Sequence, residues 1–74
     1  NNKVEAIEFE VSGDCRLIGK TLADLNIRKN ILLGSITRGK NVIIPKGSDS
    51  LQAGDTVVVV TTTERLSALD DILE

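Results

Sequence analysis

The stretch from residue 31 to residue 60 constrains the fold most, because it predicts β-strands joined by tight turns. Three segments rich in β-branched and other aliphatic residues predict the strands: Ile31–Thr37, Val42–Ile44 and Val57–Val60. A glycine marks each turn, in Arg38–Asn41 and in Ala53–Thr56. The unbroken valine run predicts a strand that is buried on both faces. We therefore expect a small sheet at the centre of the domain.

The flanking segments add a strand and two helices to this prediction. Glu5–Val11 alternates apolar and acidic residues, which is typical of a strand with one buried face. Thr21–Leu25 predicts a short helix capped by Thr21. A second helix is expected from Thr61 onward, because its leucines share one face: Leu66, Leu69 and Leu73. The predicted fold is α+β, a small β-α-β-β-β-α domain with a mostly antiparallel sheet and two helices.

Two residues inside the strand region indicate local irregularity. Gly34 lies within the second predicted strand, which indicates a bulge or a close approach of another backbone. Pro45 follows the third predicted strand and either ends it or places it at an edge, because proline cannot donate to a ladder.

Size and composition limit the classes of protein to consider. The chain has 74 residues and a net charge of -2, which predicts one domain and disfavours a nucleic-acid binder. One cysteine, Cys15, cannot form an internal disulfide and fits a reducing cytoplasm. No apolar run approaches the roughly 20 residues of a membrane span. A core this small favours burial against a second copy or a parent protein. The abrupt start without methionine predicts a fragment of a longer chain.

Catalytic and metal-binding equipment is sparse. The chain has no histidine to act as a base or ligand, and its carboxylates are scattered. Gly34–Lys40 has the spacing of a phosphate-binding P-loop. However, Asn41 replaces the magnesium-binding hydroxyl, and a predicted strand replaces the helix that would follow. We expect no enzyme activity, no metal site and no cofactor within this segment.

The polar cluster Arg28-Lys29-Asn30, between the short helix and the second strand, is the main candidate site. It is either a solvated loop or an anion contact at a dimer seam, and Arg38 beside its turn glycine allows the same two interpretations. The seam itself is expected on the short helix, the following loop and the second strand. Its candidate residues are Leu22, Leu25, Ile27 and Leu32.

A series of short motifs resembles the TrkA-C domain, the RCK C-terminal module of bacterial potassium-uptake regulators. They follow one another along most of the chain: G-K-T-L-A-D-L-N-I at 19–27, I-x-R-G at 36–39, V-I-I-P-K-G at 42–47 and L-x-x-G-D-x-V-V-V-V at 51–60. The ending T-T-T-E-R-L-S-A-L-D-D-I-L is similar to the closing segment of that family. The order and spacing of the motifs, more than any single motif, carry the resemblance.

The resemblance implies a cytoplasmic regulatory domain, residues 1–74, that forms a homodimer and controls potassium transport. The rest of its chain and a membrane potassium-transporter subunit are the implied partners, with no direct membrane insertion. NAD(H) or ATP is expected only in a neighbouring RCK nucleotide-binding domain. One branch of the family binds cyclic di-AMP between two copies, where Arg28 matches a ligand-contacting position. We favour that ligand less, because the loop from Arg28 to Ile36 is shorter here and lacks the aromatic–glycine step.

Two alternatives remain open at this point. Asn41–Lys46 followed by Gly54–Val57 is also similar to the core of AbrB-type swapped-hairpin DNA-binding proteins, although the gap is short and the chain is acidic. The other alternative is a ligand-free interaction domain of another transporter.

Overall fold

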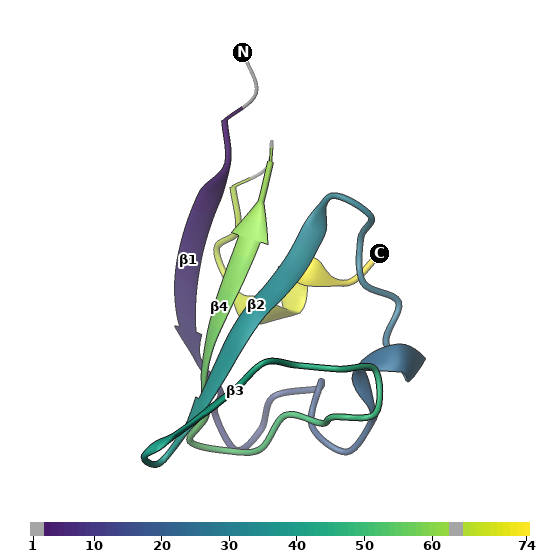
Figure 1. Ribbon diagram of the computed structural model, residues 1–74. Helices are drawn as coiled ribbons and strands as arrows, with labels where there is room; N and C mark the ends of the chain where they lie inside the picture. The colour runs from purple at the N-terminus through teal and green to yellow at the C-terminus, as the bar shows by residue number, and fades with distance from the viewer. Residues whose placement is uncertain (1–2, 63–64) are drawn as a thin grey trace.

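The computed structural model describes residues 3–62 and 65–74, in which one antiparallel sheet is the central element (Figure 1). Its strands follow the spatial order β1-β4-β2-β3. Their bounds are β1 at Glu5–Glu10, β2 at Ile31–Arg38, β3 at Asn41–Ile43 and β4 at Thr56–Thr61. The predicted antiparallel sheet and the chain order of its strands are confirmed.

β4 is the central strand and sets the two faces of the sheet. It pairs with β1 on one side and with β2 on the other. Val57 and Val59 are fully buried on the inner face, and the C-terminal segment (yellow in Figure 1) crosses behind this face. Val58 and Val60 alternate to the outer face and are only half-buried. The prediction of burial on both faces is therefore wrong for the outer face, which no other segment of the described chain covers.

The hydrophobic core lies between the inner face and the segments that pack on it. Aliphatic side chains from β1's end, β2, β4 and the connecting loops form it: Val11, Leu17, Ile31, Ile36, Leu51, Val57, Val59, Leu69 and Ile72. Ile7 and Phe9 on β1 are half-buried, whereas Glu8 and Glu10 are exposed. The alternation predicted for this strand is confirmed.

The two predicted helices are wrong, because both segments form only short 3-10 turns. These are η1 at Leu22–Asp24 and η2 at Leu69–Ile72. In η1, the backbone N–H groups of Leu22 and Ala23 donate to the carbonyls of Asp49 and Gly47, at 2.8 and 2.9 Å. Such tertiary bonds outcompete an isolated helix of a few residues, which is marginal on its own.

The C-terminal segment is likewise drawn into tertiary pairing. Leu73 forms an isolated antiparallel bridge with Ile27. The carboxylate of Asp71 accepts the backbone N–H groups of Ser67 and Ala68 and closes the turn before η2. The start of the predicted helix, Thr63 and Glu64, lies outside the described residues.

Glycines occupy the bulge in β2 and the turns that precede β3 and β4. The register of β2 against β4 shifts between Leu33 and Ser35, so the bulge at Gly34 is confirmed. Gly39 and Gly54 adopt φ values of 61° and 89° in the two turns. A side chain would strain that left-handed backbone, which explains why glycine stands there.

Candidate functional site

A groove of about 320 Å³ runs beside the N-terminal half of β2. β3 pairs only with Ile36–Arg38, so the first half of β2 has no strand neighbour on this side within the described sheet. The groove walls come from η1, the loop after it, β2 and the segment after β3. Its lining residues are Leu22, Ala23, Ile27, Arg28, Lys29, Ile31, Leu32, Leu33, Pro45, Lys46 and Gly47.

Most of the candidate seam residues line this groove. Leu22, Ile27 and Leu32 contribute to its wall, and Leu32 keeps 66% of its surface exposed. Leu25 lies elsewhere, half-buried and packed against the core. Three of the four candidate seam residues therefore share one groove, and Leu25 lies outside its lining.

Among the described residues, every charged side chain in the groove lining is basic, although the whole chain carries a net charge of -2. Arg28 and Lys29 come from the loop before β2, as the sequence predicts. Lys46 joins them from the segment after β3, and the sequence analysis missed it. Its signal was the P-K-G motif directly after a strand. A concave surface that carries only positive charge favours the binding of an anion.

Arg28 also joins the groove to the C-terminal segment. Its backbone N–H donates to the carbonyl of Ile72 at 2.9 Å, and its Nε donates to the carbonyl of Leu73 at 3.0 Å. The N–H of Glu74 donates to the carbonyl of Asn26 in the same loop, at 2.8 Å. The groove loop and the end of the chain are therefore held as one unit.

Asn30 lines a second hollow, of about 340 Å³, that adjoins the groove at Leu32. Lys29 and Ile31 line both depressions. Asn30 thus lies at the end of the groove, toward the outer face of the sheet.

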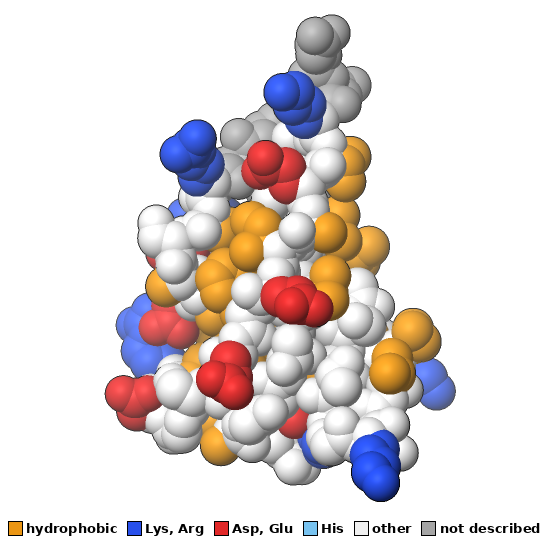
Figure 2. Space-filling model, turned by 90° about the vertical axis from the view of Figure 1, so that its left-hand side faces the viewer, with side chains coloured by type: hydrophobic (Ala, Val, Ile, Leu, Met, Phe, Trp, Pro, Cys, Tyr) orange, Lys and Arg blue, Asp and Glu red, His pale blue; other side chains and the backbone are white. Residues whose placement is uncertain are grey.

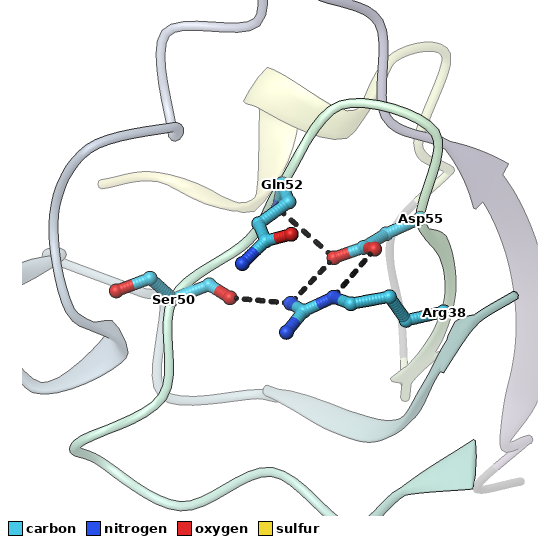
Figure 3. Close-up of polar contacts among 4 residues, drawn as sticks. All are labelled: Arg38, Ser50, Gln52 and Asp55. Atoms are coloured by element: carbon cyan, nitrogen blue, oxygen red, sulfur yellow. Dashed lines mark hydrogen bonds and ion pairs between the residues drawn. The ribbon is translucent and has the colours of Figure 1, made fainter. Parts of the chain in front are cut away.

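Arg38 is engaged in a separate polar network, away from the groove lining (Figure 3). Its Nε and a terminal nitrogen donate to the two carboxylate oxygens of Asp55, each at 2.9 Å. The same terminal nitrogen donates to the carbonyl of Ser50 at 2.9 Å. The backbone N–H of Gln52 donates to Asp55 as well. The structure gives Arg38 a clear role in joining the two turns.

The Asp55 side of this ion pair is shielded from water. The side chain of Asp55 is 1% exposed, and that of Arg38 is 33% exposed. The hydrogen bonds from Arg38 hold the pKa of Asp55 below its usual value, against the opposing effect of burial. The sequence analysis missed Asp55. The only signal was that Arg38 and Asp55 each flank a turn glycine.

Residues 3–62 and 65–74 show neither a metal-binding cluster nor a membrane-spanning helix. These residues contain no group of three or more acidic or cysteine side chains placed to hold a metal ion. None of the helical segments found there has the length and apolarity needed to cross a bilayer.

Residues 6–74 match the sequence model of the TrkA-C domain. The chain belongs to the TrkA-C family. This assignment confirms the resemblance seen in the motifs and favours the regulatory interpretation over the AbrB-like one.

Three proteins similar to this TrkA-C chain illustrate the relationship. A protein of Archaeoglobus fulgidus named Trk system potassium uptake protein TrkA homolog is 40% identical over 70 residues, which are 95% of this chain and 16% of that protein. Homolog 2 of Methanosarcina mazei is 33% identical over the same share. A homolog of Pyrococcus abyssi is 30% identical over 71 residues, 31% of its length. The chain thus spans from about a sixth to a third of these relatives.

Proposed function

We propose that this TrkA-C domain is a regulatory module of a Trk-type potassium-uptake system and pairs with a second copy along the groove beside β2. The observation that carries the proposal is the coincidence of three features at one place. A strand edge is open, Leu32 is exposed beside it, and the charged lining is wholly basic. The names of the relatives, which are TrkA homologs of Trk potassium-uptake systems, support the biological setting.

An open strand edge is a ready template for pairing with another chain. Proteins commonly protect such edges with charge, with proline or with a covering segment. Here β3 and the segment from Pro45 to Gly47 leave the first half of β2 accessible from the groove. A second copy related by a twofold axis would cover this edge and bury Leu32 of both chains.

The basic lining favours a small anion at the seam. A twofold seam would bring together Lys29 and Lys46 from both copies, and an anion bound between them would reduce their repulsion and strengthen the pairing. A phosphate-bearing ligand such as a nucleotide would supply that charge, and the apolar wall at Leu22 and Pro45 would receive a base. Cyclic di-AMP is one member of this class. We favour it less, because the loop from Arg28 to Ile36 is shorter here than in the family branch that binds it.

Regulation follows as a shift between assembly states. A ligand that binds the paired state better than the single state moves the population toward pairing. The loop that carries Arg28 is bonded to Ile72 and Leu73, so a change at the groove reaches the end of the chain directly. In this proposal the domain acts in the cytoplasm. It controls a membrane transporter subunit through the rest of its protein, where any NAD(H) or ATP binds.

The test is a thermal-shift series with cyclic di-AMP, ATP, NADH and sulfate as probes, with the mass measured in parallel. A ligand at 100 times its Kd adds about 2.7 kcal/mol to the free energy of unfolding. Lys29→Gln with Lys46→Gln should abolish the shift. The control is Lys40→Gln, an exposed lysine at the β2–β3 turn outside the groove lining.

A dimer that shows no shift with any probe would support a ligand-free interaction domain instead. A shift that survives in the double lysine variant would place the anion site elsewhere.

A further inference from the structure

The turn at residues 46–49 fixes the backbone of Lys46, which lines the groove. Pro45 precedes it, and the proline ring restricts the backbone on that side. On the other side, the carboxylate of Asp49 accepts the backbone N–H of Lys46 at 2.7 Å. The N–H of Asp49 donates in turn to the carbonyl of Lys46 at 2.9 Å. A main-chain bond and a side-chain bond therefore close the same turn.

This turn is also fastened to η1, which contributes Leu22 and Ala23 to the groove lining. The N–H of Leu22 donates to the carbonyl of Asp49 at 2.8 Å, and the N–H of Ala23 donates to the carbonyl of Gly47 at 2.9 Å. A Cβ at Gly47 would lie only 3.2 Å from the Cβ of Ala23, so the two segments are in close contact. The backbone of the turn is thus held against a wall of the groove.

We propose that Asp49 is a positioning residue for anion binding, because it holds the backbone of Lys46 where the ammonium group of this lysine reaches an anion in the groove. The inference rests on the proposed function, in which Lys29 and Lys46 bind that anion. The ligand class is a tetrahedral oxyanion, such as a phosphate or sulfate group. Asp49 lies outside the groove lining, so it acts through Lys46 and not by touching the anion.

The advantage of a fixed backbone is entropic. Anion binding orders the long side chain of Lys46 at a free-energy cost, and a mobile backbone beneath it would add to that cost. A hydrogen bond from an N–H to a carboxylate is stronger than one between neutral groups. Asp49 therefore pre-organises Lys46 more effectively than a neutral side chain that lacks an acceptor.

The charge of Asp49 has the opposite effect on anion binding. Figure 2 shows acidic side chains spread over the β1 side of the molecule, whereas Asp49 belongs to the turn beside the groove. A carboxylate there repels an anion. If charge alone mattered, removing Asp49 would strengthen anion binding, whereas loss of a positioning contact weakens it. The two effects therefore differ in sign.

The test measures the Kd of sulfate for the chain by NMR titration of its backbone amides, at constant ionic strength and at a temperature where every variant is folded. Asp49→Ala should weaken sulfate binding about fivefold. Asp49→Asn should bind sulfate as tightly as the native chain or more tightly, because its amide oxygen still accepts the N–H of Lys46 and the charge is gone.

Asp24→Ala is the matched control. Asp24 is exposed in η1, directly after the lining residue Ala23, so this variant removes the same charge while leaving the turn of Lys46 intact. Its Kd for sulfate should be unchanged or lower.

Hydrogen exchange of the Lys46 amide reports on the contact itself. Its exchange should accelerate about tenfold in Asp49→Ala and stay within about threefold of the native rate in Asp49→Asn. A purely structural role would change this exchange and the Tm while leaving the Kd for sulfate unchanged.

The outcomes separate this inference from the proposed function. Sulfate binding that is unchanged or tighter in Asp49→Ala would overturn the positioning role and leave the anion site in place. Equal weakening in Asp49→Asn or in Asp24→Ala would also overturn it. A native chain that does not bind sulfate, or that binds it no better than Lys29→Gln with Lys46→Gln, would refute the anion site itself, and the role of Asp49 with it.

Discussion

Replacing Asp55 by alanine should destabilise the domain more than any exposed charge change, because it breaks a buried ion pair. The carboxylate accepts two hydrogen bonds from Arg38 and one from the backbone of Gln52, each at 2.9 Å. Breaking a buried pair by removing one partner costs about 3–5 kcal/mol. Arg38 keeps 33% of its side chain exposed and can be rehydrated, so the lower end, about 3 kcal/mol, applies.

The assay is thermal unfolding followed by circular dichroism. In a domain of this size each kcal/mol moves Tm by roughly 4–8 °C, so we expect Asp55→Ala to lower Tm by about 15 °C. The matched control is Arg16→Met, which breaks the exposed Arg16–Asp70 pair, where Arg16 is 73% exposed. That change should cost about 0.5 kcal/mol or less.

A double-mutant cycle with Arg38→Met isolates the interaction. The two changes together should cost less than the sum of the single changes, by at least about 1 kcal/mol. If Asp55→Ala lowered Tm no more than Arg16→Met does, burial would not set the strength of this pair and the reasoning would be refuted.

Three further predictions follow from individual contacts. Thr61→Val should raise the free energy of unfolding by about 1 kcal/mol in urea unfolding, because Oγ1 of Thr61 is buried without a hydrogen-bond partner among the described residues; a loss of stability would reveal a hidden partner. Gly54→Ala should lower it by roughly 1–2 kcal/mol, because φ is 89° there, while Gly13→Ala, equally uncrowded and without a positive φ, should be near neutral. Arg38 lowers the pKa of Asp55 in the folded state. The stabilisation that the Asp55 carboxylate provides is therefore complete above its unfolded-state pKa, about 3.9. It is lost as the pH falls through the pKa of Asp55 in the folded state. The Tm difference between the native chain and Asp55→Asn should therefore stay constant near neutral pH and shrink below about pH 4, and a constant gap down to pH 2 would contradict this.

The strands were predictable because their signals are local. Alternation in β1, the turn glycines Gly39 and Gly54, and the Gly34 bulge depend only on neighbouring residues. The leucine spacing near the C-terminus correctly indicated burial, since Leu69 is buried and Leu73 packs on the core. The spacing did not indicate the backbone conformation, because tertiary hydrogen bonds decide whether this segment forms an α-helix or a 3-10 turn.

The candidate site was predictable only in part, for the same reason. Arg28 and Lys29 are adjacent in the chain, so their cluster is visible in the sequence. Lys46 reaches the groove because the backbone of Ala23 bonds to Gly47, a contact that no local pattern encodes. The pairing of Arg38 with Asp55 likewise depends on how two distant turns meet.

The most direct test of the central claim is the mass of the chain by sedimentation equilibrium, for the native sequence and two matched variants. Leu32→Asp changes the groove, and Val42→Asp changes an equally exposed valine on β3 outside it, at 66% and 68% exposure. The account predicts a mass near twice 8.0 kDa for the native chain and for Val42→Asp, and near 8.0 kDa for Leu32→Asp. A native chain at 8.0 kDa, or a Leu32→Asp variant that stays paired, would contradict the proposal that this groove is the seam.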